Sequence, residues 1–308
     1  MILSPAVFLL LVWLVYRRFP GALVGCFNRA VRMMGGIKWR ETFVDNCRWV
    51  YLDGGRGETI LLLHGFGADK DRFWTFIPAL SRSYRVIAPD LPGFGESSRL
   101  PQADHGIPRQ AERLNGFIQS LGLESFHLAG ISMGGAVAAY YAGEYPERVK
   151  SLFLMAPLSM DSLYQSRASK KFFEEGVNIF RCRTVAEFDA LIRNLFYKPP
   201  WIPGRFKEYF LKKSTADQAV RDRIMQDLLG SGLDLLEARL ERIKAEALVL
   251  WGKEDAILDV SAAEKMRARI PRCRLVVLEN CGHVPFYEKR KETIRSYRTF
   301  LHSAGSAP

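Results

Sequence analysis

The chain has 308 residues, of which 48% are hydrophobic, 25% charged and 12% aromatic. This composition excludes a disordered or collagen-like chain, and the length fits one large α/β domain. The 44 Lys and Arg outnumber the 33 Asp and Glu, so the net charge is +11 and anionic partners are favoured. No zinc-finger spacing, RNA-recognition aromatic signature or basic low-complexity tail is present, so we expect no nucleic acid and a lipid surface instead.

The N-terminal segment is apolar and is followed by basic residues. Residues 2–16 carry no charge, and Arg17 and Arg18 come directly after them. As a helix this run would cover about 22 Å, short of the ~30 Å hydrocarbon core, although snorkelling arginines could extend it. We predict a transmembrane helix that anchors the chain through residues 1–20. The basic flank would place the remainder in the cytoplasm.

A cleaved signal peptide or a lipoprotein signal is the alternative for this segment. A signal peptide needs basic residues before its apolar run, whereas here they follow it. The tetrapeptide Leu23-Val24-Gly25-Cys26 is similar to a lipoprotein cleavage box, but two arginines and Pro20 separate it from the apolar run.

The five cysteines form no CxxC pair, which favours a reducing compartment.

A second helix is predicted after Pro20. Apolar residues recur there at helical spacing, with Arg29 and Arg32 on another face. We predict a juxtamembrane amphipathic segment over residues 21–40. Two arrangements remain open: a helix that lies on the membrane, and a helix packed on the globular domain.

The body of the chain alternates short apolar runs with helical patterns, which predicts a doubly wound, mostly parallel sheet. A hairpin should precede these runs, with Arg48–Leu52 extended and a turn at Asp53-Gly54-Gly55-Arg56-Gly57. The six runs expected to form buried parallel strands are Thr59–Leu63, Arg85–Pro89, Ser125–Ala129, Ser151–Ala156, Ala247–Trp251 and Arg274–Leu278.

One interval breaks this alternation. Roughly 90 residues separate the fourth run from the fifth, too many for a loop, and their periodicity is helical. We predict a helical cap over residues 158–242, inserted into a core made of 41–157 and 243–303. Ten aromatic residues fall between Phe172 and Phe210, and we expect a minority of them to face a binding cavity.

The strongest chemical signal is Gly130-Ile131-Ser132-Met133-Gly134-Gly135, which lies between a predicted strand and the helical run Ala136–Glu144. This context is typical of a nucleophile elbow, in which small residues flank a serine on a sharp turn. A serine hydroxyl needs a base near neutral pH. Of the five histidines, only His283 follows the last strand and precedes a helix.

A base of this kind needs a carboxylate that orients it. Asp255 lies just beyond a strand, so the chain order is Ser132, Asp255, His283, as expected for such a site. Glu254, Asp259 and, more remotely, Asp161 are competing candidates for the acid, because each also lies near the end of a strand.

An oxyanion hole is predicted where the strand Thr59–Leu63 runs into His64-Gly65-Phe66-Gly67. Glycines let this backbone approach a ligand, and the N–H of Phe66 can point at a developing oxyanion. The N–H of Met133, directly after the serine, is the second expected donor. His64 is expected to support the loop rather than act as a base.

Together these motifs resemble the α/β-hydrolase family, and the resemblance covers residues 45–300. It rests on His64-Gly65-Phe66-Gly67, Pro89-Asp90-Leu91-Pro92-Gly93-Phe94-Gly95, Gly130-Ile131-Ser132-Met133-Gly134-Gly135, Trp251-Gly252-Lys253-Glu254-Asp255 and Gly282-His283. The apolar N-terminus, Leu258-Asp259-Val260-Ser261 and Leu278-Glu279-Asn280-Cys281-Gly282-His283 are similar to the membrane-anchored monoacylglycerol lipases. Relatives often have Glu-Arg-Pro after the histidine where this chain has Glu288-Lys289-Arg290, a departure expected to affect local packing.

The resemblance implies a membrane-associated serine ester hydrolase, most plausibly a monoacylglycerol lipase acting on a lipid ester without a metal or cofactor. The sequence contains no metal-ligand cluster and no phosphate- or dinucleotide-binding glycine loop. The alternatives are a hydrolase of small esters, thioesters or carbon–carbon bonds, and a catalytically silent, membrane-tethered binding protein.

Overall fold

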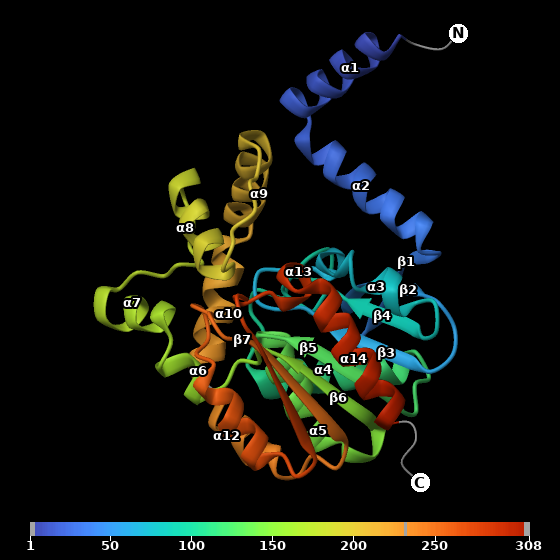
Figure 1. The fold of residues 1–308 in the computed structure, drawn as a ribbon, viewed down its shortest axis with the longest axis vertical. Helices are drawn as coiled ribbons and strands as arrows, with labels where there is room; N and C mark the ends of the chain where they lie inside the picture. Colours follow the sequence, from blue (N-terminus) through green and yellow to red (C-terminus); the bar gives the residue numbers. More distant parts are fainter. Residues whose placement is uncertain (1–3, 231–232, 305–308) are drawn as a thin grey trace.

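The computed structural model describes residues 4–230 and 233–304. Within these residues an eight-stranded sheet forms the centre, in the order β1-β2-β4-β3-β5-β6-β7-β8 (Figure 1). The six strands from β3 to β8 run parallel, and β1 and β2 are added antiparallel at one edge. The strands are β1 (Ile37–Val44), β2 (Cys47–Gly54), β3 (Thr59–Leu63), β4 (Arg85–Pro89), β5 (Phe126–Ile131), β6 (Val149–Met155), β7 (Glu246–Gly252) and β8 (Cys273–Leu278).

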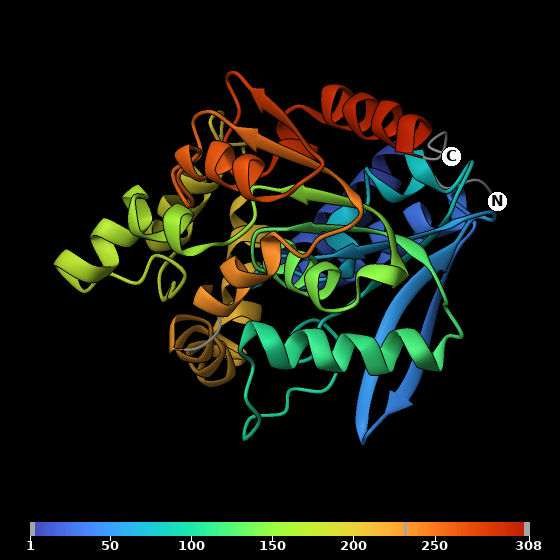
Figure 2. The ribbon, with the colours of Figure 1, turned by 90° about the horizontal axis from the view of Figure 1, so that it is seen from below.

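The predicted doubly wound sheet is confirmed, and helices cover both of its faces. Side chains alternate along β3, so Leu61 and Leu63 join one apolar cluster while Ile60 and Leu62 join the other. Figure 2 shows α4 on one side of the sheet and α14 on the other. The first cluster packs on α4 (Ile107–Ser120) and α5 (Met133–Glu144), and the second on α3 (Ile77–Leu80), α13 (Pro285–Glu288) and α14 (Arg290–Ala304).

The predicted hairpin is present, but its turn lies at a different place from the predicted one. β1 and β2 are joined at Asp45 and Asn46, with φ values of 48° and 60°. Short polar side chains tolerate this left-handed region, which a two-residue hairpin turn requires. The glycine-rich stretch instead connects β2 to β3. Its Gly55 has a φ of 82° and leaves no room for a Cβ beside the Tyr84 carbonyl.

Between β6 and β7 the described residues form helices joined by loops, with no strand among them. These helices, which we call the cap, lie beyond the sheet beside the carboxyl ends of the parallel strands (Figure 1). They are α6 (Met160–Tyr164), α7 (Arg167–Glu175), α8 (Val185–Leu195), α9 (Gly204–Ala216), α10 (Gln218–Gly230) and α11 (Leu233–Leu240). The helix α12 (Ser261–Arg269) follows β7.

The predicted transmembrane helix is not supported. In residues 4–230 and 233–304 no helix is both long enough and apolar enough to cross a membrane. α1 (Pro5–Arg18) ends before Phe19, whose φ of −136° and ψ of 58° are not helical, and Pro20 then begins α2 (Pro20–Met34). Proline has no N–H and restricts the residue before it, which accounts for the break at Phe19. Residues 1–3 of the predicted anchor lie outside the described part.

The second N-terminal helix packs on the globular domain, at least along its C-terminal half. Val31 is buried, and Phe27 stacks edge-on against Trp74 with ring centroids 5.1 Å apart. The predicted segment 21–40 therefore contains most of α2 and the start of β1. α1 and α2 extend away from the sheet beside α9 (Figure 1).

Candidate active site

Ser132 occupies a sharp turn between β5 and α5. Its φ of 55° and ψ of −123° are strained for a non-glycine residue, and its backbone is held on both sides. The N–H donates to the Met155 carbonyl at 3.0 Å, while the carbonyl accepts from the N–H of Leu158 at 3.0 Å. A Cβ on Gly134 would collide with the His64 carbonyl, so the turn requires a residue without a side chain there. This geometry is that of a nucleophile elbow.

His283 and Asp255 are in direct contact below the cap. His283 Nδ1 lies 2.8 Å from Asp255 Oδ2, and the two side chains are 5% and 0% exposed. The other donors to this carboxylate are Trp251 Nε1 at 3.1 Å and the N–H groups of Ile257 and Leu258 at 2.8 and 3.1 Å. These donors hold the carboxylate in place, and its contact with Nδ1 matches the Nδ1–H tautomer of His283, in which Nε2 carries no proton.

The three competing acids are occupied elsewhere. Glu254 accepts the N–H of Cys281 at 2.9 Å, Asp259 accepts the N–H of Ser261 at 2.9 Å, and Asp161 pairs with Lys265. Of the four candidates, Asp255 is the one that contacts His283.

The loop that carries His283 is held by Glu288, whose role the sequence did not indicate. One carboxylate oxygen accepts the N–H of Gly282 at 2.7 Å, and the other accepts the N–H groups of Tyr197 and Lys198, at 2.7 and 3.1 Å, just beyond α8. Burial raises the pKa of this carboxyl. Glu288 therefore ties the histidine loop to the cap, where only local packing was expected.

The predicted oxyanion loop lies against the serine. A Cβ built on Gly65 would be 3.2 Å from Ser132 Cβ and 3.7 Å from Oγ. His64 supports this loop, as expected: its Nδ1 is 2.8 Å from the Gly65 carbonyl, and its Nε2 accepts the N–H of Leu91 at 3.0 Å. Both ring nitrogens are engaged and burial lowers the pKa of the ring, so His64 is not a general base.

An apolar pocket begins at Ser132 and extends under the cap. It encloses about 670 Å³ of atom-free space, open solvent at its mouth included. Of the ten cap aromatics, Phe172, Phe173 and Phe180 line it, and the other seven do not. The two expected oxyanion residues, Phe66 and Met133, also line it. So do Ile257 and Leu258, whose N–H groups bind Asp255.

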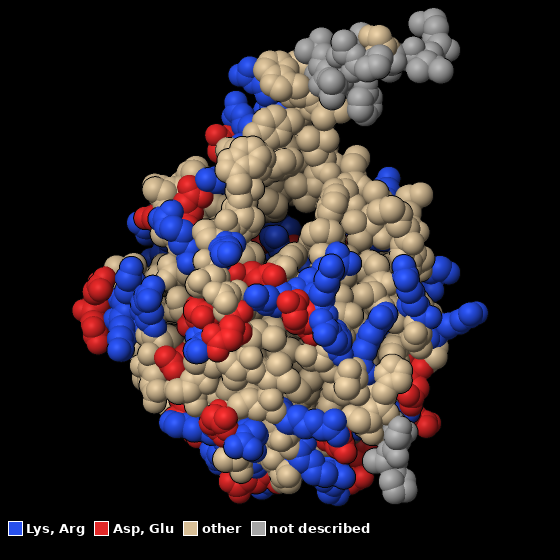
Figure 3. Space-filling model, in the orientation of Figure 1, with Lys and Arg blue, Asp and Glu red and all other residues tan. Residues whose placement is uncertain are grey.

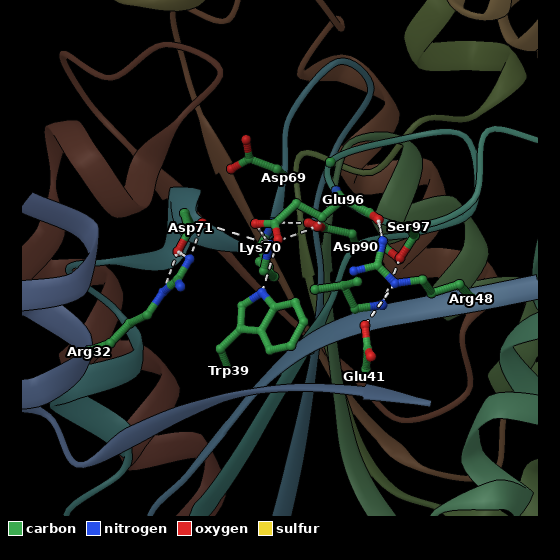
Figure 4. Close-up of polar contacts among 12 residues, drawn as sticks. Arg32, Trp39, Glu41, Arg48, Asp69, Lys70, Asp71, Asp90, Glu96 and Ser97 are labelled. Carbon is green, nitrogen blue, oxygen red and sulfur yellow. Dashed lines mark hydrogen bonds and ion pairs between the residues drawn. The ribbon is translucent and has the colours of Figure 1, made fainter. Parts of the chain in front are cut away.

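A buried polar network, also missed from the sequence, holds the loops after β3 and β4. Lys70 is 1% exposed, and its Nζ lies 2.8 Å from both Asp90 and Glu96 (Figure 4). Asp90 is completely buried and accepts the N–H groups of Lys70 and Glu96, each at 2.7 Å. A buried lysine beside a buried aspartate satisfies both charges. The network thus supports the segment that follows the oxyanion loop.

Comparison with known proteins agrees with the fold. The profile described as "alpha/beta hydrolase fold" matches residues 58–290, and the chain belongs to this family. Lipase 1 of Psychrobacter immobilis is 32% identical over 262 residues, covering 84% of this chain and 82% of the relative. Human monoacylglycerol lipase ABHD6 is 28% identical, covering 92% and 88%.

A solved structure extends the likeness over almost the whole chain. A membrane phospholipase A, described as a bacterial virulence factor, superposes with a TM-score of 0.88 and 37% identity, and 98% of each chain is covered. Family membership and these relatives make the chain a carboxylic ester hydrolase.

Proposed function

We propose that the chain is a serine lipase that releases fatty acid from a monoacylglycerol. Ser132 Oγ attacks the ester carbonyl while His283 takes its proton, and Asp255 stabilises the resulting imidazolium. The N–H groups of Phe66 and Met133 bind the oxyanion. His283 then protonates the departing glycerol and activates the water that hydrolyses the acyl-enzyme.

The observation that carries this proposal is the position of the elbow serine at the start of an apolar pocket. The three cap phenylalanines and Leu158, Leu228 and Met225 offer the pocket almost no polar contact. Each acyl CH₂ buried there contributes up to about 0.8 kcal/mol, which favours a long acyl chain over acetate.

A phospholipid is the second candidate substrate. The relative that shares 37% identity over 98% of the chain is named a membrane phospholipase A. The pocket can bind the acyl chain of either substrate, since the two differ in the head group outside it.

Attachment to a membrane is part of the proposal. Val12, Trp13 and Leu14 of α1 are exposed, and so is Trp201 of the cap, at 86%. Arg17 and Arg18 follow on the same helix. Exposed aromatic and aliphatic side chains beside basic residues suit a helix that lies in the interface. The cytoplasmic placement predicted above depends on a membrane-crossing helix, so the proposal is limited to attachment.

A fluorophosphonate probe and a pair of variants test the mechanism. The wild-type chain should be labelled, and Ser132→Ala should lose both labelling and about three or more orders of magnitude in kcat on mono-oleoylglycerol. Ser98→Ala serves as a control, because Ser98 lies away from the pocket and accepts the N–H of Arg48. Near-normal turnover by folded Ser132→Ala would rule out the serine mechanism, and turnover of butyrate but not oleate esters would favour the small-ester alternative.

A further inference from the structure

Two arginines beside the oxyanion loop have no acidic partner. Arg72 lies on the short helix η1 (Lys70–Phe73), and Arg221 lies on α10. Neither guanidinium has a carboxylate within ion-pair distance among the described residues. Arg221 Nε is buried without a hydrogen-bond partner, and its Nη1 reaches only Ser214. Arg72 stands over the Phe210 ring at 5.2 Å.

The acidic groups nearby are already engaged. Asp217 pairs with Arg99 at 3.0 Å, and Asp222 pairs with Arg181. Asp69, the carboxylate that acts most strongly on Arg72, accepts Lys213 Nζ at 3.0 Å. Arg72 and Lys213 therefore share Asp69, and Arg221 has no carboxylate within ion-pair distance among the described residues.

The positive charge of Arg221 is not fully compensated inside the protein, whereas the pKa of Arg72 is raised because Asp69 and Asp71 outweigh its burial. Burial lowers the pKa of the Arg221 guanidinium from its usual value, and the charge on Arg72 lowers it further. A cation removed from water is stable only beside an anion, so an arginine pair of this kind is suited to an anionic ligand.

The pair lies next to the oxyanion loop. The Arg221 guanidinium is 5.6 Å from the Phe66 ring centroid, and its Nη2 fills the space that a Cβ on Gly67 would need. Figure 3 shows a hollow between α9 and α2 with basic side chains at its base. Lys213 on α9 is half exposed and adds positive charge beside Asp69.

We propose that Arg72 and Arg221 form an anion site that binds the phosphate of a glycerophospholipid, or phosphate itself, beside the oxyanion loop. Guanidinium groups bind phosphate oxygens through paired hydrogen bonds. In an acyl glycerophospholipid only glycerol carbons and ester oxygens separate the acyl carbonyl from phosphorus. A phosphate beside Gly67 therefore leaves the ester within reach of Phe66 and Ser132. The lipid form of the proposal depends on the proposed ester hydrolysis.

Matched substrates test the site. We measure kcat/KM for 1-oleoyl-lysophosphatidylglycerol and for mono-oleoylglycerol in non-ionic micelles. The substrate ratio is the first value divided by the second. In Arg72→Gln/Arg221→Gln the ratio should fall about tenfold or more, the loss expected for a charge-assisted hydrogen bond. Arg223→Gln is the control, because Arg223 lies on the same helix, is exposed and pairs with Asp227. Its ratio should stay within about twofold. An equal loss on both substrates would exclude recognition of the lipid phosphate.

A binding measurement separates this site from the proposed function. Inorganic phosphate should raise the Tm of Ser132→Ala above that in chloride of equal ionic strength, and Arg221→Gln should abolish the rise. If phosphate raises the Tm but the substrate ratio does not change, the site binds free phosphate. If the substrate ratio changes but phosphate does not raise the Tm, the site binds the lipid head group. If both effects are absent and the chain still hydrolyses esters, the anion site is overturned and the proposed function stands. Stabilisation without hydrolysis of either ester overturns the proposed function alone. If the double variant does not fold, Arg221→Lys keeps the charge and should still lower the ratio.

Discussion

Arg32 and Asp71 form a two-point ion pair that joins α2 to the segment after the oxyanion loop. Arg32 Nη2 lies 2.6 Å from both carboxylate oxygens and Nε lies 3.0 Å from one of them. Asp71 sits between Lys70, which binds Asp90, and Arg72 of the proposed anion site. An N-terminal helix is thereby connected to the loops that surround the serine.

Breaking this pair should destabilise the protein. Arg32→Ala removes both short contacts to a partly buried carboxylate and leaves it, among the described residues, only Lys70 Nζ at 3.8 Å. We therefore expect the free energy of unfolding in urea to fall by about 1–3 kcal/mol. Arg29→Ala on the same helix should change it by less than about 0.5 kcal/mol, because Arg29 is exposed. The exchanged pair Arg32→Asp/Asp71→Arg should recover part of the loss. Equal stability of the two alanine variants would show that the ion pair contributes little.

A methyl group on Gly65 should impair catalysis more than folding. Its Cβ would be 3.2 Å from Ser132 Cβ, so the serine or the loop must move by a few tenths of an ångström. For Gly65→Ala we expect kcat on p-nitrophenyl butyrate to fall about tenfold, since nucleophile placement is sensitive to small shifts. Gly25→Ala, whose Cβ would meet nothing within 4 Å, is the control. A normal kcat would mean that the loop yields without moving the serine.

Pocket aromatics should set the preference for acyl length. For glycerol monoesters from acetyl to oleoyl, kcat/KM should rise with chain length until the pocket is filled. Phe172→Ala should lower it several-fold more for oleoyl than for butyryl esters, because Phe172 lines the pocket. Phe188→Ala, elsewhere in the cap, should change both esters alike. A profile that falls steadily from acetyl onward would argue against a lipid substrate.

Acid should destabilise the fold through buried histidines. Burial lowers the pKa of His64, so the unfolded chain binds a proton more readily than the folded one. His64 therefore contributes stability above pH ~6.5, and this is lost as the pH falls toward its folded pKa. Between about pH 7.5 and about pH 5, the free energy of unfolding in urea should fall further in wild type than in His64→Gln. The difference should be on the order of 1 kcal/mol. In the control His302→Gln, at an exposed position, the unfolding free energy should change with pH as it does in wild type. The same change with pH in His64→Gln would exclude this role for His64.

Removal of residues 1–18 should weaken membrane binding while ester hydrolysis persists. The deletion removes the exposed Trp13 and Leu14 but no residue of the candidate site. We expect co-sedimentation with phosphatidylglycerol-containing vesicles to fall and the remainder, through Arg29 and Lys38, to be salt-sensitive. Arg32, also basic, is engaged with Asp71. Failure of the full chain to co-sediment would contradict membrane attachment.

Local sequence patterns determined the framework of this protein. The six parallel strands were predicted to within two residues at each end, since buried strands need continuous apolar runs. The turn at Ser132 was equally clear, because a strand, a serine between glycines and a helix lie within one short stretch of chain. The break at Phe19 and Pro20 was also local, but the apolar composition outweighed it in the transmembrane prediction.

Tertiary structure decided the contacts between distant residues. The sequence favoured Asp255 but left Glu254, Asp259 and Asp161 open. Packing directed His283, Trp251 and two backbone N–H groups onto Asp255. Glu288 holds the histidine loop to Tyr197 and Lys198, which lie 91 and 90 positions earlier in the chain. Arg221 of α10 packs against Phe66 of the oxyanion loop. Periodicity reports which face of an element is buried, but not which partner it meets, because that depends on how separate elements pack together.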